Sequence, residues 1–135
     1  MDVKQVICMR KDLNMRKGKQ VAQGAHASML VLLNMMNQHH SEDLDMTTLT
    51  LKIDDGSSLA RWLLTGTFKK IVVSVDSEEE LLDIYQKALD NLFPAALITD
   101  SGLTEFDGVP TKTCIAIGPA ISERLDKITG HLKLL

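Results

Sequence analysis

Polar side chains that could bind an anion gather where the first apolar segment of the chain ends. Four cations form a basic loop there: Arg10, Lys11, Arg16 and Lys17. A helix is expected to begin at Lys17 or Gly18, and on it Lys19, Gln23 and His26 fall at i, i+4 and i+7. At about 100° per residue, this spacing keeps the three side chains within roughly 60° of one another. With the free N–H groups and positive dipole end of the helix, they predict an anion-binding site.

A second polar group follows the third expected strand, in the segment D-S-G-L-T that begins at Asp100, and Thr113 lies on the next strand. Ligands of open α/β sheets bind outside the carboxyl ends of the strands. If the first and third strands are parallel and adjacent, Asp100 should lie near Lys19 and Gln23. An ammonium, an amide, a carboxylate and hydroxyls can orient a water molecule and stabilise an oxyanion without a metal. The ammonium should also keep Asp100 ionised.

Each of these residues has a plainer interpretation as well. D-S-G is common turn chemistry, Lys19 alone is typical of a solvated lysine, and a single histidine such as His26 is more often packed than catalytic. The phosphate-binding pattern G-x-x-x-x-G-K-[ST], the dinucleotide pattern G-x-G-x-x-G and the nucleophile turn G-x-S-x-G are all missing. Residue types and spacing therefore support an anion-binding α/β domain that could carry a hydrolytic site.

Length and composition indicate one ordinary globular domain. The chain has 135 residues, of which 44% are hydrophobic and 24% charged, and its net charge is −3. The charge is unevenly divided: five cations and one acid lie between Arg10 and Lys19, and five acids without a cation lie between Asp76 and Asp83. A weakly acidic protein with one basic pole can hold a polyanion at that pole, whereas indiscriminate coating of nucleic acid is disfavoured.

The sequence also bears on location and redox chemistry. There is no run of about 18 apolar residues that would span a membrane, and the first residues lack the apolar centre of a signal peptide. We therefore expect a cytoplasmic protein. Cys8 and Cys114 both fall in expected strands, where they are interpreted as small buried hydrophobic side chains, not as a disulfide or redox pair. No cysteine or histidine spacing suggests zinc.

The elements that would position the polar residues alternate along the chain. Strands are expected at 3–9, 70–75, 95–99 and 113–117, and helices at 17–36, 59–64, 77–91 and from Pro119 to Gly130. This order predicts an α/β layered domain with a mostly parallel sheet. Five apolar positions of the first helix follow helical spacing and are expected to face the core: Val21, Ala25, Met29, Leu32 and Met36.

Several longer segments resemble one protein family. They are M-R-K-D-L-N-M-R-K-G-K-Q-V-A-Q-G-A-H-A-S from Met9, K-K-I-V-V-S-V-D-S-E-E-E-L from Lys69, D-S-G-L-T-E-F from Asp100, T-C-I-A-I-G-P from Thr113 and D-K-I-T-G-H-L-K-L from Asp126. In this order the segments resemble the second type of peptidyl-tRNA hydrolase, found in archaea and eukaryotes. With the alternation of elements, the resemblance implies a three-layer α/β/α sandwich around a mixed, mostly parallel four-stranded sheet. It also implies hydrolysis of the ester between peptide and tRNA.

Carried over by position, the resemblance implies roles for individual residues. Lys19 would bind the tRNA end or the developing oxyanion, and Gln23 would position the ester carbonyl. Asp100, with Thr104 or Thr113, would orient and polarise the attacking water. His26 matches a histidine on the same helix, with a catalytic or a structural role. The tRNA phosphates would be contacted by the basic loop, through Arg10, Lys11, Arg16 and Lys17. Neither a metal nor a cofactor is implied, whereas a homodimer is.

One segment of the single domain departs from the family pattern. From Gln38 to Ser58 the chain is longer than the usual link between the first two helices, and residues 48–53 alternate like a strand. The segment could be an edge strand, a lid or an insertion that reshapes tRNA docking. Two rival hypotheses stay open at this stage. One is a binding module that holds an RNA end or a protein partner without catalysis, and the other is an amidase or deaminase of small substrates.

Overall fold

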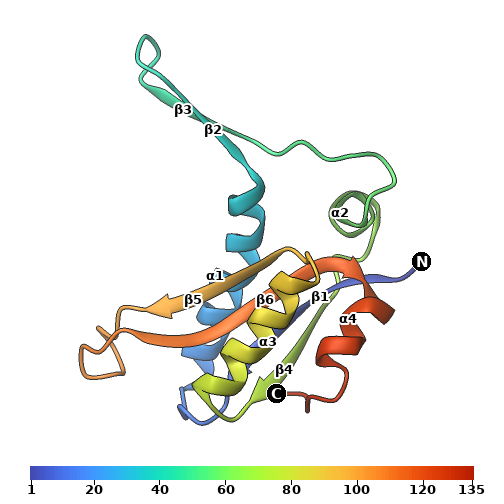
Figure 1. Ribbon diagram of the computed structural model, residues 1–135. Helices are drawn as coiled ribbons and strands as arrows, with labels where there is room; N and C mark the ends of the chain where they lie inside the picture. Colours follow the sequence, from blue (N-terminus) through green and yellow to red (C-terminus); the bar gives the residue numbers. More distant parts are fainter.

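A four-stranded sheet lies at the centre of the computed structural model, which describes residues 1–135 (Figure 1). Its strands are β1 (Val3–Arg10), β4 (Lys70–Val75), β5 (Ala95–Asp100) and β6 (Thr111–Ile121), in the order β4-β1-β6-β5. β1 pairs parallel to β4 and antiparallel to β6, and β6 pairs antiparallel to β5. The predicted mixed α/β fold is confirmed. The sheet is not mostly parallel, however, because β6 runs against both of its neighbours.

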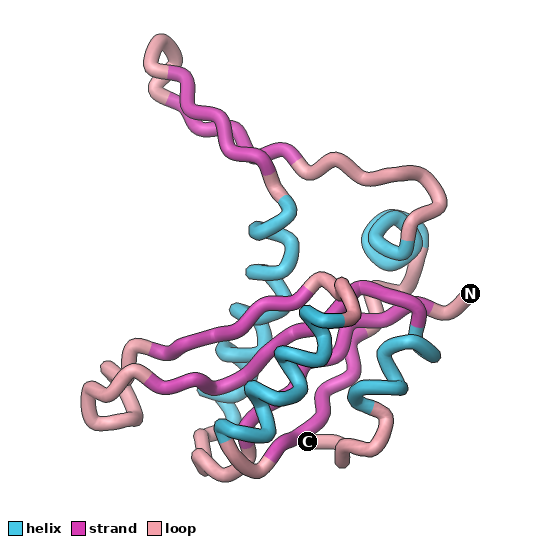
Figure 2. Tube along the Cα trace, viewed as in Figure 1, coloured by secondary structure: helices cyan, strands magenta, loops and turns pink.

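Helices cover both faces of this sheet and complete the three layers that the resemblance implies (Figure 2). α3 (Glu78–Asp90) and α4 (Ser122–Thr129) lie on one face, and α1 (Lys17–Met35) lies on the other. Successive strand residues point to opposite faces. Val6 and Cys8 of β1 therefore pack toward α3 and α4, whereas Ile7 and Met9 pack toward α1. None of the helices is both long enough and apolar enough to cross a bilayer.

Both cysteines are buried free thiols, as predicted. Cys8 belongs to the core on the α3 and α4 side, and Cys114 belongs to the core on the α1 side. Burial raises the pKa of Cys8 to about 12 and that of Cys114 to about 11. The two thiols thus stay protonated and act as small hydrophobic groups on opposite faces of the sheet.

Two serines cap helices where the sequence indicates. The Ser77 hydroxyl accepts the N–H of Glu80 at 3.0 Å and begins α3, whose first turn holds three glutamates. Ser57 accepts the N–H of Ala60 at 3.1 Å and begins α2 (Ser58–Ala60). α2 continues into a π-helical turn, η1 (Arg61–Thr65), in which Trp62 is buried. The helix expected at 59–64 is therefore present, with a wider last turn.

The long segment after α1 forms a second, separate sheet. β2 (Asn37–Ser41) and β3 (Met46–Thr50) pair antiparallel as a hairpin that projects beyond the C-terminal end of α1 (Figure 1). Every residue of the two strands is exposed except Ser41, which is half-buried. We call residues 37–50 the hairpin arm. It is not an edge strand of the central sheet, which was one of the expectations for this segment.

The face that α1 turns to the core differs from the prediction. Val21, Ala25 and Met29 are exposed, and of the five expected core residues only Leu32 is buried. The helix instead buries its positions at Gln23, Gly24, Ala27, Ser28, Val31 and Leu32. Small residues at three of these positions let the helix lie close to the sheet. Gln23 is buried with them because it finds hydrogen-bond partners there.

The last helix also begins later than predicted. Gly118 and Pro119 lie inside β6, which continues to Ile121 before α4 begins at Ser122. All residues from Thr113 to Ala120 are buried. The burial of this apolar run extends the strand past the proline that was expected to open the helix.

Candidate active site

Four elements bring polar side chains to one edge of the sheet. β1 and β5 both end at this edge, at Arg10 and Asp100, and β6 begins there at Thr111. α1 starts beside the same edge, after a loop that the buried Met15 holds in place. The carbonyl oxygen of Met15 accepts a hydrogen bond from Gln20 Nε2 at 3.1 Å. The first and third expected strands are not adjacent, since β6 separates them. Their ends nevertheless meet at one edge, because β1 and β5 run in the same direction.

Lys19 and Asp100 form an ion pair at this edge. Lys19 Nζ lies 2.8 Å from Asp100 Oδ1, and the two side chains are only 15% and 11% exposed. The hydrogen bond from Lys19 lowers the pKa of Asp100 below its ordinary value, and the N–H of Gly102, which donates to Oδ2 at 2.9 Å, adds to this effect. The two side chains therefore meet, and Asp100 is held ionised, as the sequence predicted.

Gln23 and Thr113 form a buried chain of hydrogen bonds that leads to the Asp100 carboxylate. Gln23 Nε2 donates to Asp100 Oδ1 at 3.2 Å, and Gln23 Oε1 accepts the Thr113 hydroxyl at 2.6 Å. Both side chains are buried, Thr113 completely. Since the hydroxyl donates to the amide oxygen, the amide nitrogen must face Asp100. Thr113 thus orients Gln23 without reaching the surface of the site itself.

The backbone after β5 closes around the same carboxylate. Gly102 has φ +81°, and a Cβ placed on it would lie 2.3 Å from the carbonyl oxygen of Val109. The turn of D-S-G therefore exists, and it requires glycine for both conformation and space. Its N–H bond to Asp100 Oδ2 fixes the side chain of that residue. The turn and the catalytic interpretation of this segment are compatible.

Lys19 retains one donor for a ligand. An ammonium has three N–H donors; one goes to Asp100 and one to Thr104 Oγ1, at 3.1 Å. Thr104 is exposed, and its hydroxyl hydrogen has no acceptor in the protein. The ring of Phe106 lies 5.9 Å from Lys19 Nζ and borders the ammonium. A cationic donor and a hydroxyl donor therefore open to solvent together, beside an ionised carboxylate.

The cations of the basic loop occupy three different situations. The Arg10 guanidinium holds both carboxylate oxygens of Asp12, and it donates to the carbonyl oxygen of Lys112 at 3.0 Å. Arg16 pairs with Glu105 at 2.9 Å, which ties the basic loop to the 101–110 loop. Lys11 and Lys17 are exposed and form no ion pair.

His26 does not join the cluster. Its side chain is exposed and makes no hydrogen bond, although it lies on the same helix as Lys19 and Gln23. Sequence reasoning also missed Glu105 and Phe106. These lie in the segment D-S-G-L-T-E-F, but only folding places them beside Arg16 and Lys19. No group of three or more histidine, cysteine, aspartate or glutamate side chains is placed to hold a metal ion.

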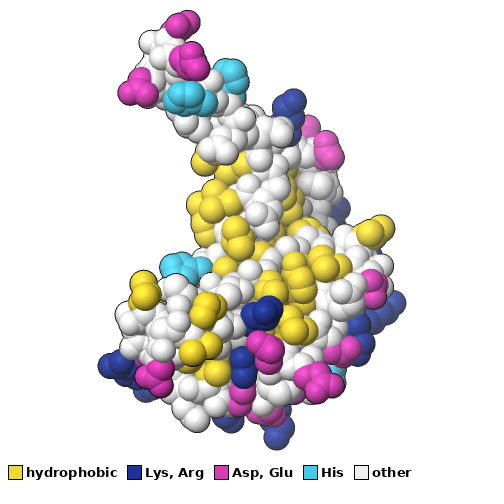
Figure 3. Space-filling view, turned by 60° about the vertical axis from the view of Figure 1, so that its left-hand side comes forward, with side chains coloured by type: hydrophobic (Ala, Val, Ile, Leu, Met, Phe, Trp, Pro, Cys, Tyr) yellow, Lys and Arg dark blue, Asp and Glu magenta, His cyan; other side chains and the backbone are white.

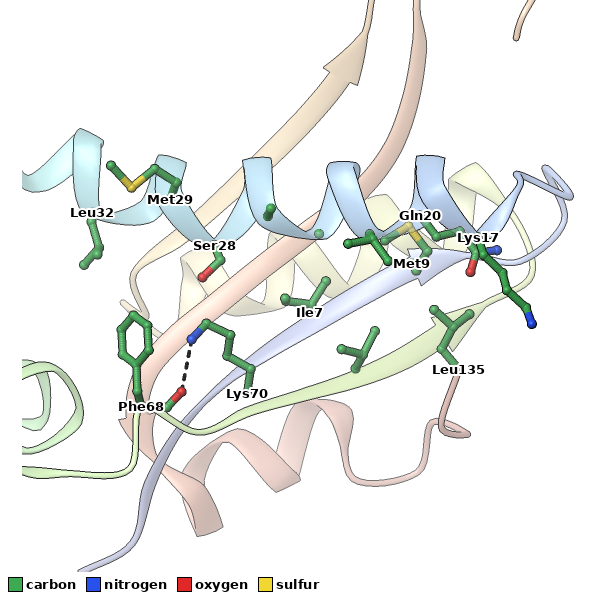
Figure 4. Close-up of a pocket in the computed structure, with 14 residues that line it drawn as sticks. Ile7, Met9, Lys17, Gln20, Ser28, Met29, Leu32, Phe68, Lys70 and Leu135 are labelled. Carbon is green, nitrogen blue, oxygen red and sulfur yellow. Dashed lines mark hydrogen bonds between the residues drawn. The ribbon is translucent and has the colours of Figure 1, made fainter. Parts of the chain in front are cut away.

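A cavity lies elsewhere, on the opposite flank of α1. It measures about 670 Å³ and is lined by 14 residues, nine of them hydrophobic. Figure 4 shows it between α1 and the strands β1 and β4, with Phe68 and Lys70 at one end and Lys17 at the other. None of Lys19, Gln23, Asp100, Thr104 and Thr113 lines it. The polar cluster instead lies at the sheet edge, outside this cavity.

Residues 3–135 match the family described as "Peptidyl-tRNA hydrolase PTH2". A peptidyl-tRNA hydrolase of Methanocaldococcus jannaschii is 42% identical over 133 residues, which cover 98% of this chain and all of the relative. A peptidyl-tRNA hydrolase of Sulfurisphaera tokodaii is 42% identical over 135 residues, with both chains covered completely. One from Methanothermobacter thermautotrophicus is 38% identical over 133 residues, again with the whole relative covered.

Proposed function

Because the chain belongs to the peptidyl-tRNA hydrolase family PTH2, we propose that it hydrolyses the ester between peptide and tRNA at the Lys19 and Asp100 cluster. The observation that carries the assignment of the site is the 2.8 Å contact between these two side chains. It joins the start of α1 to the end of β5 and gathers the polar residues at one solvent-facing edge. Substrate and products differ by one water, so the site needs to place that water against an ester carbonyl.

Lys19 stabilises the charge that develops during attack. Addition of water to the ester carbonyl turns the carbonyl oxygen into an oxyanion, and collapse of this intermediate breaks the bond to the ribose oxygen. One N–H of the Lys19 ammonium is free to donate to the oxyanion. Because the ammonium is largely desolvated, its interaction with a negative charge is stronger than it would be in water. Thr104 offers a second donor next to it. Lys19 therefore binds the oxyanion, and the ribose oxygen leaves as a hydroxyl after it takes up the proton that the attacking water gave up.

Asp100 orients the water and holds Lys19 in place. Its lowered pKa keeps it a carboxylate at neutral pH and makes it a weak base. Oδ2 accepts one N–H from Gly102 and retains a lone pair that can accept a hydrogen from water. Gln23 is positioned by Thr113 and carries a second amide hydrogen toward the site. In this scheme Thr113 is a positioning residue, and Gln23 aligns the ester.

The basic loop binds the tRNA phosphates. Lys11 and Lys17 are free to contact them directly, and Arg16 can exchange Glu105 for a phosphate. Arg10 holds the loop in shape through Asp12 and the backbone of Lys112, and it borders the phosphate site. His26 takes no part in the chemistry. The same proposal includes a reaction that needs no metal, a cytoplasmic location and a homodimer.

The experiment is hydrolysis of N-acetyl-aminoacyl-tRNA by the pure protein in EDTA, measured as free tRNA released. Wild-type protein should turn the substrate over. Asp100→Ala should lower kcat by roughly 10²- to 10⁴-fold, while the neighbouring Ser101→Ala, whose hydroxyl makes no hydrogen bond, should retain wild-type activity. Binding of the substrate without release of tRNA would support the rival binding module. Full turnover by Asp100→Ala would place the active site elsewhere.

A further inference from the structure

Lys70 is a half-buried cation that has no carboxylate partner. It takes part in none of the ion pairs of the molecule, whereas four other half-buried cations each pair with an acidic side chain: Lys4, Arg10, Lys19 and Lys69. Burial lowers the pKa of Lys70 below its ordinary value. A partly desolvated cation without a counter-ion is unfavourable, so an anion that reaches this ammonium would be bound there.

Two aromatic rings hold the Lys70 ammonium in place. Its Nζ lies 3.3 Å from the centroid of the Phe68 ring and 4.9 Å from that of the Trp62 ring. One N–H donates to the Phe68 carbonyl oxygen at 3.0 Å, so two of the three N–H donors have no oxygen acceptor in the protein. Phe68 makes both contacts from a backbone with φ +60°. This conformation is strained for a bulky side chain, and such strain gathers at ligand sites.

The ammonium lies at one end of the apolar cavity between α1 and the strands β1 and β4 (Figure 4). The volume of about 670 Å³ is within the range of small-molecule sites. Along α1 the lining extends from Lys17 to Leu32, which corresponds to about 22 Å of helix. No acidic side chain lines the cavity. It is therefore a long apolar space with a lysine at each end.

The other polar side chains of the lining already donate within the protein. Ser28 donates its hydroxyl to Gln5 Oε1 at 2.6 Å, and Gln20 donates its amide to the Met15 carbonyl oxygen. A peptide bound against these walls would bury amide groups without hydrogen-bond partners, which is unfavourable for each group. A straight aliphatic chain has no polar group to satisfy. The lining thus favours an amphipathic molecule whose single polar group is an anion at one end.

The cavity is open to solvent along α1. Val21 is 73% exposed and Met29 is 51% exposed, and both line the cavity. Figure 3 shows a band of hydrophobic side chains below the hairpin arm, whereas acidic side chains gather at the tip of the arm. Exposed apolar surface of this kind is typical of ligand grooves. A ligand can enter without displacing the core, and it covers apolar surface that otherwise faces water.

We propose that this cavity binds a single-chain fatty carboxylate such as decanoate. The carboxylate accepts an N–H of Lys70 that the protein leaves free, and the alkyl chain lies along Ile7 and Met9 between α1 and the strands. Each methylene group that leaves water adds to the affinity. The affinity should therefore increase with chain length until the chain fills the cavity.

This site is separate from the proposed hydrolytic site. None of Lys19, Gln23 and Asp100 lines the cavity, and Lys70 begins β4, at the opposite edge of the sheet from β5. Lys17 is the one residue that the cavity lining shares with the cations of the basic loop, and it lies at the end away from Lys70. Binding can be measured without hydrolysis, so the failure of either proposal leaves the other standing.

The first test uses Trp62, the only tryptophan of the chain, as a reporter. Its ring lies 4.9 Å from Lys70 Nζ, so a carboxylate bound to this ammonium should change its fluorescence. Titration with decanoate below its micellar concentration should give a saturable change, and calorimetry should give one site per chain. Decanol, which has the same chain without a charge, should bind roughly tenfold or more weakly. Absence of saturable binding, or equal affinity for decanol, would overturn the proposal.

The second test changes the two parts of the site separately, with calorimetry as the measurement. Lys70→Met keeps an unbranched side chain without the charge, so it should weaken decanoate binding roughly tenfold or more and leave decanol binding unchanged. Lys112→Met removes another half-buried cation that has no ion pair, and it should bind decanoate like wild-type protein. Ala25→Phe fills the cavity from an exposed position and should weaken the binding of both ligands. Wild-type affinity for decanoate in Lys70→Met or in Ala25→Phe would refute the site.

A third comparison identifies the occupant. An apolar peptide with a free carboxyl group also presents an anion beside apolar groups. N-acetyl-trileucine should nevertheless bind more weakly than decanoate, because its amide groups find no partners in the lining. Tighter binding of the peptide would contradict the choice of a fatty carboxylate.

Discussion

The two flanks of α1 differ in whether their side chains find partners within the chain. On one flank Lys19 and Gln23 are polar, sheltered and hydrogen-bonded to Asp100, and no buried side-chain nitrogen or oxygen anywhere in the molecule lacks a partner. On the other flank Val21 and Met29 are apolar and exposed. A buried polar network is favourable only when all of its donors and acceptors have hydrogen-bond partners. An exposed apolar ridge is unfavourable in water until another surface covers it. The polar flank is thus complete within one chain, whereas the apolar flank is not.

The largest effect should come from removing the charge of the polar flank. Lys19→Met keeps much of the side-chain volume and loses the donor to the oxyanion, so kcat should fall by roughly 10²- to 10³-fold. Lys87→Met, which removes an exposed cation paired only with Asp83, serves as the control. Single-turnover rates of tRNA release measure both. A Lys19→Met protein with normal turnover would remove the ammonium from the mechanism.

The next largest effect concerns the support beneath the site. Thr113→Val is nearly isosteric but leaves Gln23 Oε1 buried without its donor, which should lower the free energy of unfolding by about 1–3 kcal/mol. The amide of Gln23 would also lose its fixed orientation, so kcat should fall while KM changes little. Thr113→Ser retains the hydroxyl and should restore both values. Urea unfolding and steady-state kinetics test this, and equal behaviour of the two variants would show that the hydroxyl is dispensable.

Two glycines should respond in opposite directions. Gly102→Ala requires an unfavourable positive φ and places Cβ against the Val109 carbonyl oxygen, so it should destabilise the fold by about 1–3 kcal/mol and displace Asp100. Gly24→Ala meets only the ends of Ile7 and Met9 at 3.8 Å, and it should stabilise α1 by roughly 0.5–1 kcal/mol. Melting temperatures should therefore fall for one and rise for the other. A shift of the same sign in both would contradict the packing described here.

The smallest effect is a pH dependence of stability. The pKa of Asp100 is lowered mainly by the hydrogen bond from Lys19. A lowered pKa stabilises the fold above the unfolded value, about 3.9 for aspartate, and this stabilisation is lost as pH falls toward the folded value. The free energy of unfolding should therefore fall more steeply below about pH 4 in wild-type protein than in Asp100→Asn. Asp2, whose pKa is also lowered, is common to both proteins. Parallel curves would contradict the ion pair.

The sequence predicted the contact between the site residues better than it predicted the packing of α1. Lys19 and Asp100 are 81 positions apart, yet their place after strand ends was enough to predict their contact. The prediction held although the two strands are not adjacent, because only a shared edge was required. Periodicity failed on α1, where Val21, Ala25 and Met29 formed the stronger apolar pattern. It identified a face that prefers to be covered, but not whether the core or another molecule covers it.

Some features depend on long-range contacts that no local pattern records. Arg16 reaches Glu105 only once both loops are folded. Likewise, His26 has the helical spacing of a site residue but points to solvent, because the cluster lies toward β5 and β6 and not above the helix. For the segment that holds the hairpin arm, the sequence offered one alternating stretch, residues 48–53, and the alternatives of an edge strand, a lid or an insertion. Its strands contact each other alone, so the rest of the sequence offered no constraint on its form.

In the proposed mechanism Lys19 and Asp100 act as one unit, and a double-mutant cycle is the sharpest test of this coupling. Single-turnover hydrolysis would be measured for wild-type protein, Lys19→Met, Asp100→Asn and the double variant. If the pair works together, the double variant should be no slower than the slower single variant, because the first substitution already disables the unit. Rate losses that multiply in the double variant would show that the two residues act independently and would contradict their joint role in catalysis.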